Sequence, residues 1–119
     1  CTKTDNIIIM ADFNATQDSD LYKIITSNGF EDTYESSKYR FAPTGTGNGF
    51  RINYFNYRRI DHIFVSPRFM VHKHGVLTYN YWQPAQDEQG NSHKAHVISD
   101  HYPIAATLEL PSRTKNENL

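Results

Sequence analysis

The chain has 119 residues, the length of one small domain, and 38% of them are hydrophobic, which is enough to supply one core. Charged residues make up 21% and the formal net charge is -1. No apolar run reaches the ~20 residues that a membrane-spanning helix needs, so no membrane span is predicted. The single Cys1 excludes an intramolecular disulfide framework and leaves the cellular compartment open.

Charge is distributed unevenly along the chain. Residues 36–60 contain five basic residues and no acidic one, a charge of +5, so the rest of the chain carries -6. Aromatic residues are interleaved with these cations, and positive charge beside aromatic rings suits phosphorylated or nucleic-acid ligands. Taken alone, the segment is more simply explained as a solvated loop whose rings partly enter the core. The cations are Lys38, Arg40, Arg51, Arg58 and Arg59, and the aromatic residues are Tyr39, Phe41, Phe50, Tyr54, Phe55 and Tyr57.

The N-terminal part of the chain predicts one strand and one helix. Residues 7–10 form a short, continuous apolar run, which is typical of a strand buried on both faces. Ser19 or Asp18 can cap a short helix near residues 19–28, whose apolar residues follow helical spacing. Gly29 then supplies a left-handed stop.

The remaining chain predicts a loop, three strands and two polar segments. In the strand at residues 59–65, alternation places Asp61, Ile63 and Val65 on one face and His62 and Phe64 on the other. In chain order the segments are a loop at 31–53, a strand at 59–65, a looser strand at 71–82, a mobile polar stretch at 83–94 with a turn at Gly90 and Asn91, a strand at 104–110 and a frayed tail at 112–119.

Asp12 and Asn14 come directly after the first predicted strand. A carboxylate in this position lies at the carboxyl edge of a sheet, where open α/β sheets place ligand-binding groups. Both side chains are therefore candidates for a shared crevice. The alternative is an Asx turn, a common device at strand ends, and it is the preferred reading when no other motif is considered.

Asp61 lies inside a strand, where an ionised carboxylate is costly unless it is paired or hydrogen-bonded. Arg58 or Arg59 would give it a structural partner. A histidine from another strand would instead give a functional pair, because the carboxylate would fix one tautomer and raise the basicity of the imidazole. The two explanations have similar weight, and His101 is the histidine that we expect.

Residues 99–103, Ser-Asp-His-Tyr-Pro, come just before the last predicted strand. Asp100 offers a hard oxygen ligand and His101 a titratable group, and phosphoester hydrolysis uses both kinds of group. The alternative is a turn with a surface histidine. A serine hydrolase built on Ser99 and His101 is disfavoured, because no glycine pattern surrounds the serine.

Four other histidines form two close pairs in the sequence. His72 and His74 would share one face of a strand, and His93 and His96 could ligate a metal on a turn. Each pair lacks the further ligands of a closed metal site, so surface histidines are expected at these positions.

Three motifs resemble, in order and spacing, signature blocks of the endonuclease/exonuclease/phosphatase superfamily. They are residues 11–14 (Ala-Asp-Phe-Asn), residues 59–66 (Arg-Ile-Asp-His-Ile-Phe-Val-Ser) and residues 99–103. Residues 44–50 are similar to the block with glycine and threonine that precedes the arginine-aspartate strand in bacterial members. The resemblance covers about residues 5–110. It implies an α/β fold of the deoxyribonuclease-I-like type: half of a two-sheet, four-layer α/β sandwich with mostly antiparallel strands and one short helix.

The resemblance also implies catalytic roles. Asp12 would orient or deprotonate the attacking water, and Asn14 would hydrogen-bond a phosphoryl oxygen as charge builds there. Asp61 would hold His101, which would contact the phosphate and transfer protons. Asp100 would contribute to a Mg²⁺ or Mn²⁺ site. Whether Asp12 or His101 is the general base is left open.

Two features differ from the family pattern. Ala11 stands where the family usually has glycine, which matters only if that backbone needs a positive φ. Members also use an asparagine and a metal-binding glutamate from an N-terminal half, and nothing before Ile7 can provide them. Residues 1–119 are therefore expected to be the C-terminal part of a single domain, which needs the missing half or another chain as its partner.

Two classes of function follow from these observations. The first is a metal-dependent phosphoesterase that hydrolyses a phosphodiester, as a nuclease does, or a phosphomonoester, by in-line attack of water. Its partner would be a phosphate ester such as nucleic acid, with phospholipids and inositol phosphates as the alternative substrate class, and Arg59 is predicted as a further phosphate contact. The second is an inactive or truncated half-domain that serves as a binding or structural module, and the missing glutamate supports it.

Overall fold

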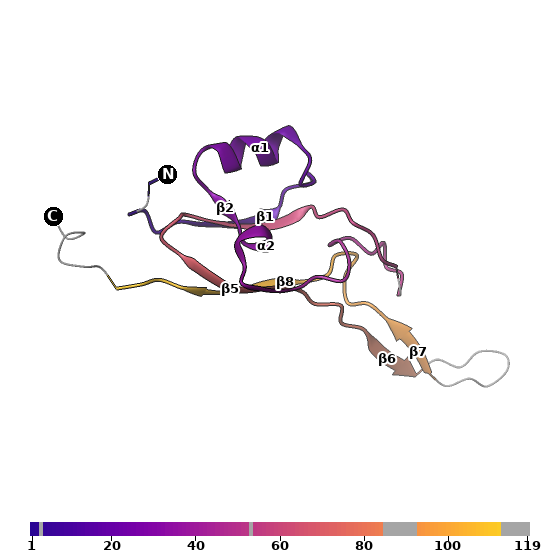
Figure 1. The fold of residues 1–119 in the computed structure, drawn as a ribbon. Coiled ribbons are helices and arrows are strands. Elements are labelled where there is room, and N and C mark those ends of the chain that lie inside the picture. Colours follow the sequence, from indigo (N-terminus) through magenta and orange to yellow (C-terminus); the bar gives the residue numbers. More distant parts are fainter. Residues whose placement is uncertain (3, 53, 85–92, 113–119) are drawn as a thin grey trace.

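The computed structural model describes residues 1–2, 4–52, 54–84 and 93–112, which form two three-stranded sheets, a two-stranded hairpin and two helices (Figure 1). The elements in chain order are β1 (Ile8–Asp12), α1 (Asp20–Ser27), β2 (Glu31–Asp32), α2 (Thr33–Ser36), β3 (Tyr39–Phe41), β4 (Asp61–Val65), β5 (Met70–Val76), β6 (Tyr81–Pro84), β7 (His93–His96) and β8 (Ile104–Glu109).

The two larger sheets lie in separate layers, and α1 covers the outer face of the first sheet (Figure 1). The first sheet has the strand order β1-β4-β2 and the second has the order β3-β5-β8. Ile63 and Val65 of β4 pack against Val71 of β5 and the apolar side chains of β8, so a hydrophobic core lies between the layers. The chain thus has the expected α/β architecture, a partial two-sheet sandwich whose strands are mostly antiparallel.

Alternation along β4 separates two environments, as predicted. Ile63 and Val65 face the second sheet, whereas the rings of His62 and Phe64 lie 5.4 and 5.6 Å from the ring of Tyr22 in α1. Full burial of a side chain such as Phe64 contributes about 1.5–3 kcal/mol to folding. The same alternation puts Asp61 on the face of the sheet that looks toward the second layer.

The helix at α1 confirms the local prediction. Ser19 has an extended backbone, and its hydroxyl accepts a hydrogen bond from the Tyr22 amide at 3.2 Å. Asn28 ends the helix, and Gly29 follows with a φ of +92°, the left-handed conformation that glycine adopts without strain.

Residues 31–53 contain three short regular elements, so the prediction of a loop is wrong for the first part of this segment. The Asp32 side chain caps α2 by accepting a hydrogen bond from the Tyr34 amide at 3.0 Å. Strand β3 pairs in parallel with β5. The cap of α2 and the pairing of β3 with a distant strand outweigh the local turn propensity. The structure therefore has a second helix, α2, in addition to the single helix that was expected.

Residues 71–82 form parts of two strands instead of one. Strand β5 pairs with β8, while β6 leaves that sheet and pairs with β7. The predicted turn at Gly90 and Asn91 lies outside the described residues, and so does most of the stretch that we expected to be mobile. The expectation is wrong for the described ends of that stretch, residues 83–84 and 93–94, because they pair with each other in β6 and β7. The predicted tail likewise falls there, apart from Ser112.

Strand β1 is more exposed than predicted. Met10 is 71% exposed and Ile8 is 46% exposed, because β1 has β4 as its single strand partner among the described residues and forms the edge of its sheet. The expectation that this strand is buried on both faces is therefore wrong for the chain as described. Neither of the two helices in the described ranges has the length and apolarity to cross a membrane.

Candidate functional site

Asp12 and Asp61 lie opposite each other in the first sheet. Strand β1 ends at Asp12, β4 begins at Asp61, and the antiparallel register pairs these two residues directly. Because the strands run in opposite directions, both carboxylates come to the same end of the sheet. The Phe13 amide donates to the Ile60 carbonyl at 2.8 Å and extends the pairing by one residue.

His101 reaches these carboxylates from the loop before β8, in the second layer. Its Nδ1–H donates a hydrogen bond to Asp61 Oδ2 at 2.8 Å, and its Nε2 lies 3.8 Å from Asp12 Oδ2. One ligand atom from each of the three side chains lies within 4.8 Å of those from the other two. We call Asp12, Asp61 and His101 the carboxylate-histidine cluster. The predicted contact between Asp61 and His101 is confirmed.

The surrounding carboxylates raise the pKa of His101 above its ordinary value. The hydrogen bond to Asp61 is the largest cause, partial burial acts in the opposite direction, and the charges of Asp61, Asp12 and Asp100 add to the increase. The imidazole therefore keeps its proton to a higher pH than a free histidine does. Its side chain is still 27% exposed, so a ligand can reach it.

Asp12 also forms the Asx turn that was the alternative explanation of this motif. Its Oδ1 accepts a hydrogen bond from the Asn14 amide at 2.9 Å, while Oδ2 is the oxygen that faces His101. Asn14 has a φ of +49°, which asparagine tolerates, and it is exposed beside Asp12. The turn and the cluster are compatible, since the turn fixes the orientation of the carboxylate. Ala11 has no positive φ, so alanine causes no strain there.

The loop at residues 44–50 holds the cluster in place, a role that the sequence analysis missed. Thr46 is fully buried, and its hydroxyl oxygen accepts hydrogen bonds from the amides of Ile60 and Asp61 at 3.0 and 3.3 Å. Its carbonyl accepts one from the Tyr102 amide at 2.7 Å. Thr46 thus joins the start of β4 to the segment that carries the histidine.

Asn48 makes the second link in this loop. It is fully buried, its amide donates to the Asp100 carbonyl at 2.7 Å, and its Nδ2 donates to the Ser99 carbonyl at 2.9 Å. Gly47, between the two linking residues, pairs with His101 as an isolated β-bridge. The sequence signal for this role was the alternation of glycine with Thr44, Thr46 and Asn48. When such polar side chains are buried, they need hydrogen-bond partners, and backbone groups that have no strand partner can supply them.

Arg59 lies in a different environment from the cluster. Its guanidinium bonds Asp32 Oδ2 at 3.0 Å and stacks over the Tyr34 ring, 3.6 Å from the centroid, and the residue is 5% exposed. A buried, ion-paired guanidinium is not free to bind a substrate, so the prediction that Arg59 contacts a phosphate does not fit this geometry. Asp61 pairs with His101, and Arg59 pairs instead with Asp32 and stacks on Tyr34.

The other histidines have structural environments. His74 is buried, its Nδ1 lies 2.8 Å from the Thr33 hydroxyl, and burial lowers its pKa to about 4. The expectation of a surface histidine is therefore wrong for His74, because the strand register shifts between Val71 and Lys73. His72 is partly exposed and pairs with Glu109. The side chain of His93 lies outside the described part of the structure.

The cluster offers a donor set that fits a hard divalent cation. Mg²⁺ is commonly held by one or two carboxylates, while water and substrate phosphates complete its shell. Asp61 Oδ2 is engaged by His101, which leaves the second oxygen of Asp61 and the partly exposed carboxylate of Asp12. Asp100 is exposed and its charge acts on His101, but it is not one of the three converging side chains.

Residues 2–101 match the sequence profile of the Endonuclease/Exonuclease/phosphatase family, and the chain belongs to this family. A family protein from Bacteroides thetaiotaomicron is 39% identical over 91% of the chain, with a TM-score of 0.82. A mannosyl-6-phosphatase from the same organism is 41% identical over 87% of the chain, with a TM-score of 0.79. A family protein from Bacteroides vulgatus is 30% identical over 89% of the chain, with a TM-score of 0.67.

The chain spans only part of the length of these relatives. It covers 38% of the first two structures and 37% of the third. A comparison with curated proteins found no match. Family and fold therefore rest on the sequence profile and on solved structures, each of which contains considerably more chain.

Proposed function

We propose that the protein is a divalent-metal-dependent phosphoesterase whose reaction centre includes the carboxylate-histidine cluster. The observation that carries the proposal is the convergence of Asp12 and Asp61 of the first sheet with His101 of the loop before β8. A titratable imidazole beside carboxylates supplies the proton-transfer groups and oxygen ligands that phosphoester hydrolysis uses. Membership of the family supports a hydrolase of this kind.

The proposed roles of these side chains follow from which atoms remain free. Asp61 occupies Nδ1 of His101, so Nε2 is the atom that faces Asp12 and can contact a phosphoryl oxygen or exchange a proton. Asp12 would orient or deprotonate the attacking water. The exposed Asn14, whose backbone is fixed by the turn at Asp12, would donate a hydrogen bond to a phosphoryl oxygen.

A Mg²⁺ or Mn²⁺ ion would be held by carboxylate oxygens: those of Asp12 and Asp61 that His101 leaves free in the cluster, and the carboxylate of the exposed Asp100, which the family resemblance implies as a metal ligand. When bound, such an ion neutralises charge that develops on the phosphoryl oxygens. These carboxylates alone do not supply the six ligands that Mg²⁺ takes, so water, substrate or further protein groups would complete its shell.

The bond that is cleaved is a phosphomonoester or a phosphodiester. The mannosyl-6-phosphatase among the structural relatives supports a sugar phosphomonoester as the first substrate to test. The acid-free segment at residues 36–60, with its charge of +5, supports a substrate of high negative charge, such as a nucleic acid or an inositol phosphate. In-line attack of water on phosphorus can cleave either type of bond.

The proposal is tested by phosphate or nucleotide release from the full-length protein. Mannose 6-phosphate, inositol phosphates, phospholipids, DNA and RNA are each incubated with Mg²⁺, with Mn²⁺ and with a chelator. We expect hydrolysis of at least one substrate, and its loss when the chelator is present. Hydrolysis of none of them with either metal would favour the alternative, a non-catalytic binding module.

A further inference from the structure

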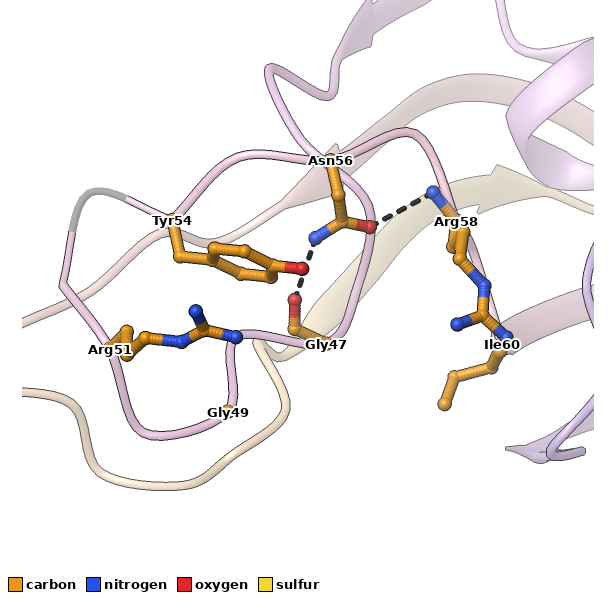
Figure 2. Close-up of a pocket in the computed structure, with 7 residues that line it drawn as sticks. All are labelled: Gly47, Gly49, Arg51, Tyr54, Asn56, Arg58 and Ile60. Atoms are coloured by element: carbon orange, nitrogen blue, oxygen red, sulfur yellow. Dashed lines mark hydrogen bonds between the residues drawn. The ribbon is translucent and has the colours of Figure 1, made fainter.

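A pocket of about 230 Å³ lies beside the loop at residues 44–50, which contributes Gly47 and Gly49 to its lining (Figure 2). Two of its lining residues connect it to the cluster: Gly47 pairs with His101, and Ile60 immediately precedes Asp61. Through these two residues the wall of the pocket continues into the backbone that holds the cluster. The other lining residues are Gly49, Arg51, Tyr54, Asn56 and Arg58.

Two arginines and no acidic residue line the pocket. The Arg51 guanidinium stacks on the Tyr54 ring at 4.0 Å from its centroid, and in Figure 2 Gly47 lies between Arg51 and Arg58. Within the described residues neither guanidinium forms an ion pair with a carboxylate, in contrast to the buried Arg59. Two cations without acidic partners create a positive potential in the pocket, which attracts anions.

The backbone around these arginines is fixed by Asn56. Its Nδ2 donates to the Gly47 carbonyl and its Oδ1 accepts from the Arg58 amide, each at 2.9 Å (Figure 2). Its own amide donates to the Thr44 hydroxyl at 3.0 Å. Hydrogen bonds hold the wall of the pocket and stacking holds Arg51, so binding of a ligand costs little conformational entropy in the protein.

We propose that this pocket binds a second phosphate group of the substrate, next to the one that is hydrolysed. The inference rests on the proposed phosphoesterase function and adds a substrate class to it, that of molecules with two phosphates on one scaffold. Guanidinium groups match the geometry of phosphate oxygens and can bond them in a bidentate manner. Tyr54 contributes the face on which one of these guanidinium groups is placed.

The test compares substrates that differ by one phosphate on the same scaffold. The pairs are mannose 6-phosphate with mannose 1,6-bisphosphate, inositol 1-phosphate with inositol 1,4-bisphosphate, and thymidine 5′-phosphate with thymidine 3′,5′-bisphosphate. We expect the full-length enzyme to show a KM about tenfold lower for the bisphosphate of the pair that it hydrolyses. Arg51→Gln and Arg58→Gln should each remove most of this difference and leave kcat within about twofold.

Lys38→Gln is the matched control, since it removes the same charge from the same segment but at a residue outside the pocket. If the wild type is active and both arginine variants match this control on every pair, the inference is wrong while the proposed function stands. If no pair is hydrolysed, titration calorimetry with thymidine 3′,5′-bisphosphate decides the role of the pocket. Weaker binding by the arginine variants than by Lys38→Gln supports the inference, and equal binding overturns it.

Discussion

At the scale of single residues, the hydrogen bond between Asp61 and His101 connects the two sheets at the site. Asp61 has a side chain that is only 15% exposed, and a carboxylate in that position is costly without a partner. His101 supplies the partner from the second layer, and in return its ring is held with Nε2 directed toward Asp12. One contact therefore satisfies a structural demand of β4 and orients a titratable group.

We predict that Asp61→Asn lowers the pKa of His101. The wild-type pKa is raised above the ordinary value of 6.5, so the stabilisation from the charged pair is fully present below that pH and is lost as the pH rises through the raised pKa. Asparagine removes the carboxylate charge and weakens the hydrogen bond, and both changes favour the neutral imidazole. NMR titration of the His101 ring protons in metal-free protein measures the shift.

Glu109→Gln is the control for this titration. Glu109 pairs with His72 at the end of β8 that is remote from His101, so its loss should leave the His101 titration as it is in the wild type. A His101 titration that does not move in Asp61→Asn would show that the carboxylate does not act on the imidazole.

The pairing of Asp61 with His101 could be predicted because a carboxylate in a strand needs a partner and the third motif offered one. The environment of Arg59 could not be predicted from the sequence. Its burial depends on Asp32 and Tyr34, which come from a segment whose turn-forming residues predicted a loop.

At the scale of elements, the loop at residues 44–50 lies between two segments and is hydrogen-bonded to both, as a strand inside a sheet would be. Its backbone and buried polar side chains bond the start of β4 on one side and the Ser99 to Tyr102 segment on the other. Loops usually lie on the surface, where water satisfies their polar groups. Here the loop's own threonine and asparagine side chains satisfy backbone groups inside the protein.

We predict that Gly45→Ala destabilises the protein by about 2–4 kcal/mol. A methyl group at this position would overlap the carbonyl oxygen of Arg58, which is backbone and cannot move aside without shifting the whole loop. The cost is measured as the free energy of unfolding in urea, with the full-length protein.

Gly47→Ala is the matched control in the same loop. Nothing lies within 4 Å of the methyl group that it would add, so its cost should stay within about 1 kcal/mol. Equal losses of stability in the two variants would contradict the tight packing of Gly45 against the Arg58 backbone.

Elements with local signals were predictable and those with distant partners were not. Helix α1 carries its own cap and stop, so its limits follow from nearby residues. Strands β2 and β3 are two and three residues long, and they exist through pairing with β4 and β5. No pattern within such short segments identifies a partner that lies tens of residues away.

At the scale of the whole molecule, the apolar side chains of β1 lie exposed at the edge of a sheet. Met10 and Ile8 would be expected inside a protein, and the chain spans only 37–38% of the length of its structural relatives. We predict that another segment or another chain covers this strand in the full-length protein. The fold class followed from the motifs and the strand alternation, but the exposure of β1 depends on which neighbours are present.

Met10→Asp tests this prediction through stability. If Met10 is covered, the aspartate buries an unpaired charge and should lower the free energy of unfolding of the full-length protein by at least about 2 kcal/mol. Asn80→Asp, at an exposed position, serves as the control and should change it by no more than about 0.5 kcal/mol. A loss for Met10→Asp as small as that of the control would mean that β1 faces solvent.

The most direct test of the central claim is the turnover number of His101→Ala with Mg²⁺ and the best substrate of the wild-type protein. Loss of a group that transfers protons and contacts phosphate should lower kcat by about 10²–10⁴-fold, while His72→Ala, which removes a histidine from a distant strand, should stay within about twofold. A His101→Ala variant that turns over at the wild-type rate would contradict the assignment of the reaction to this cluster.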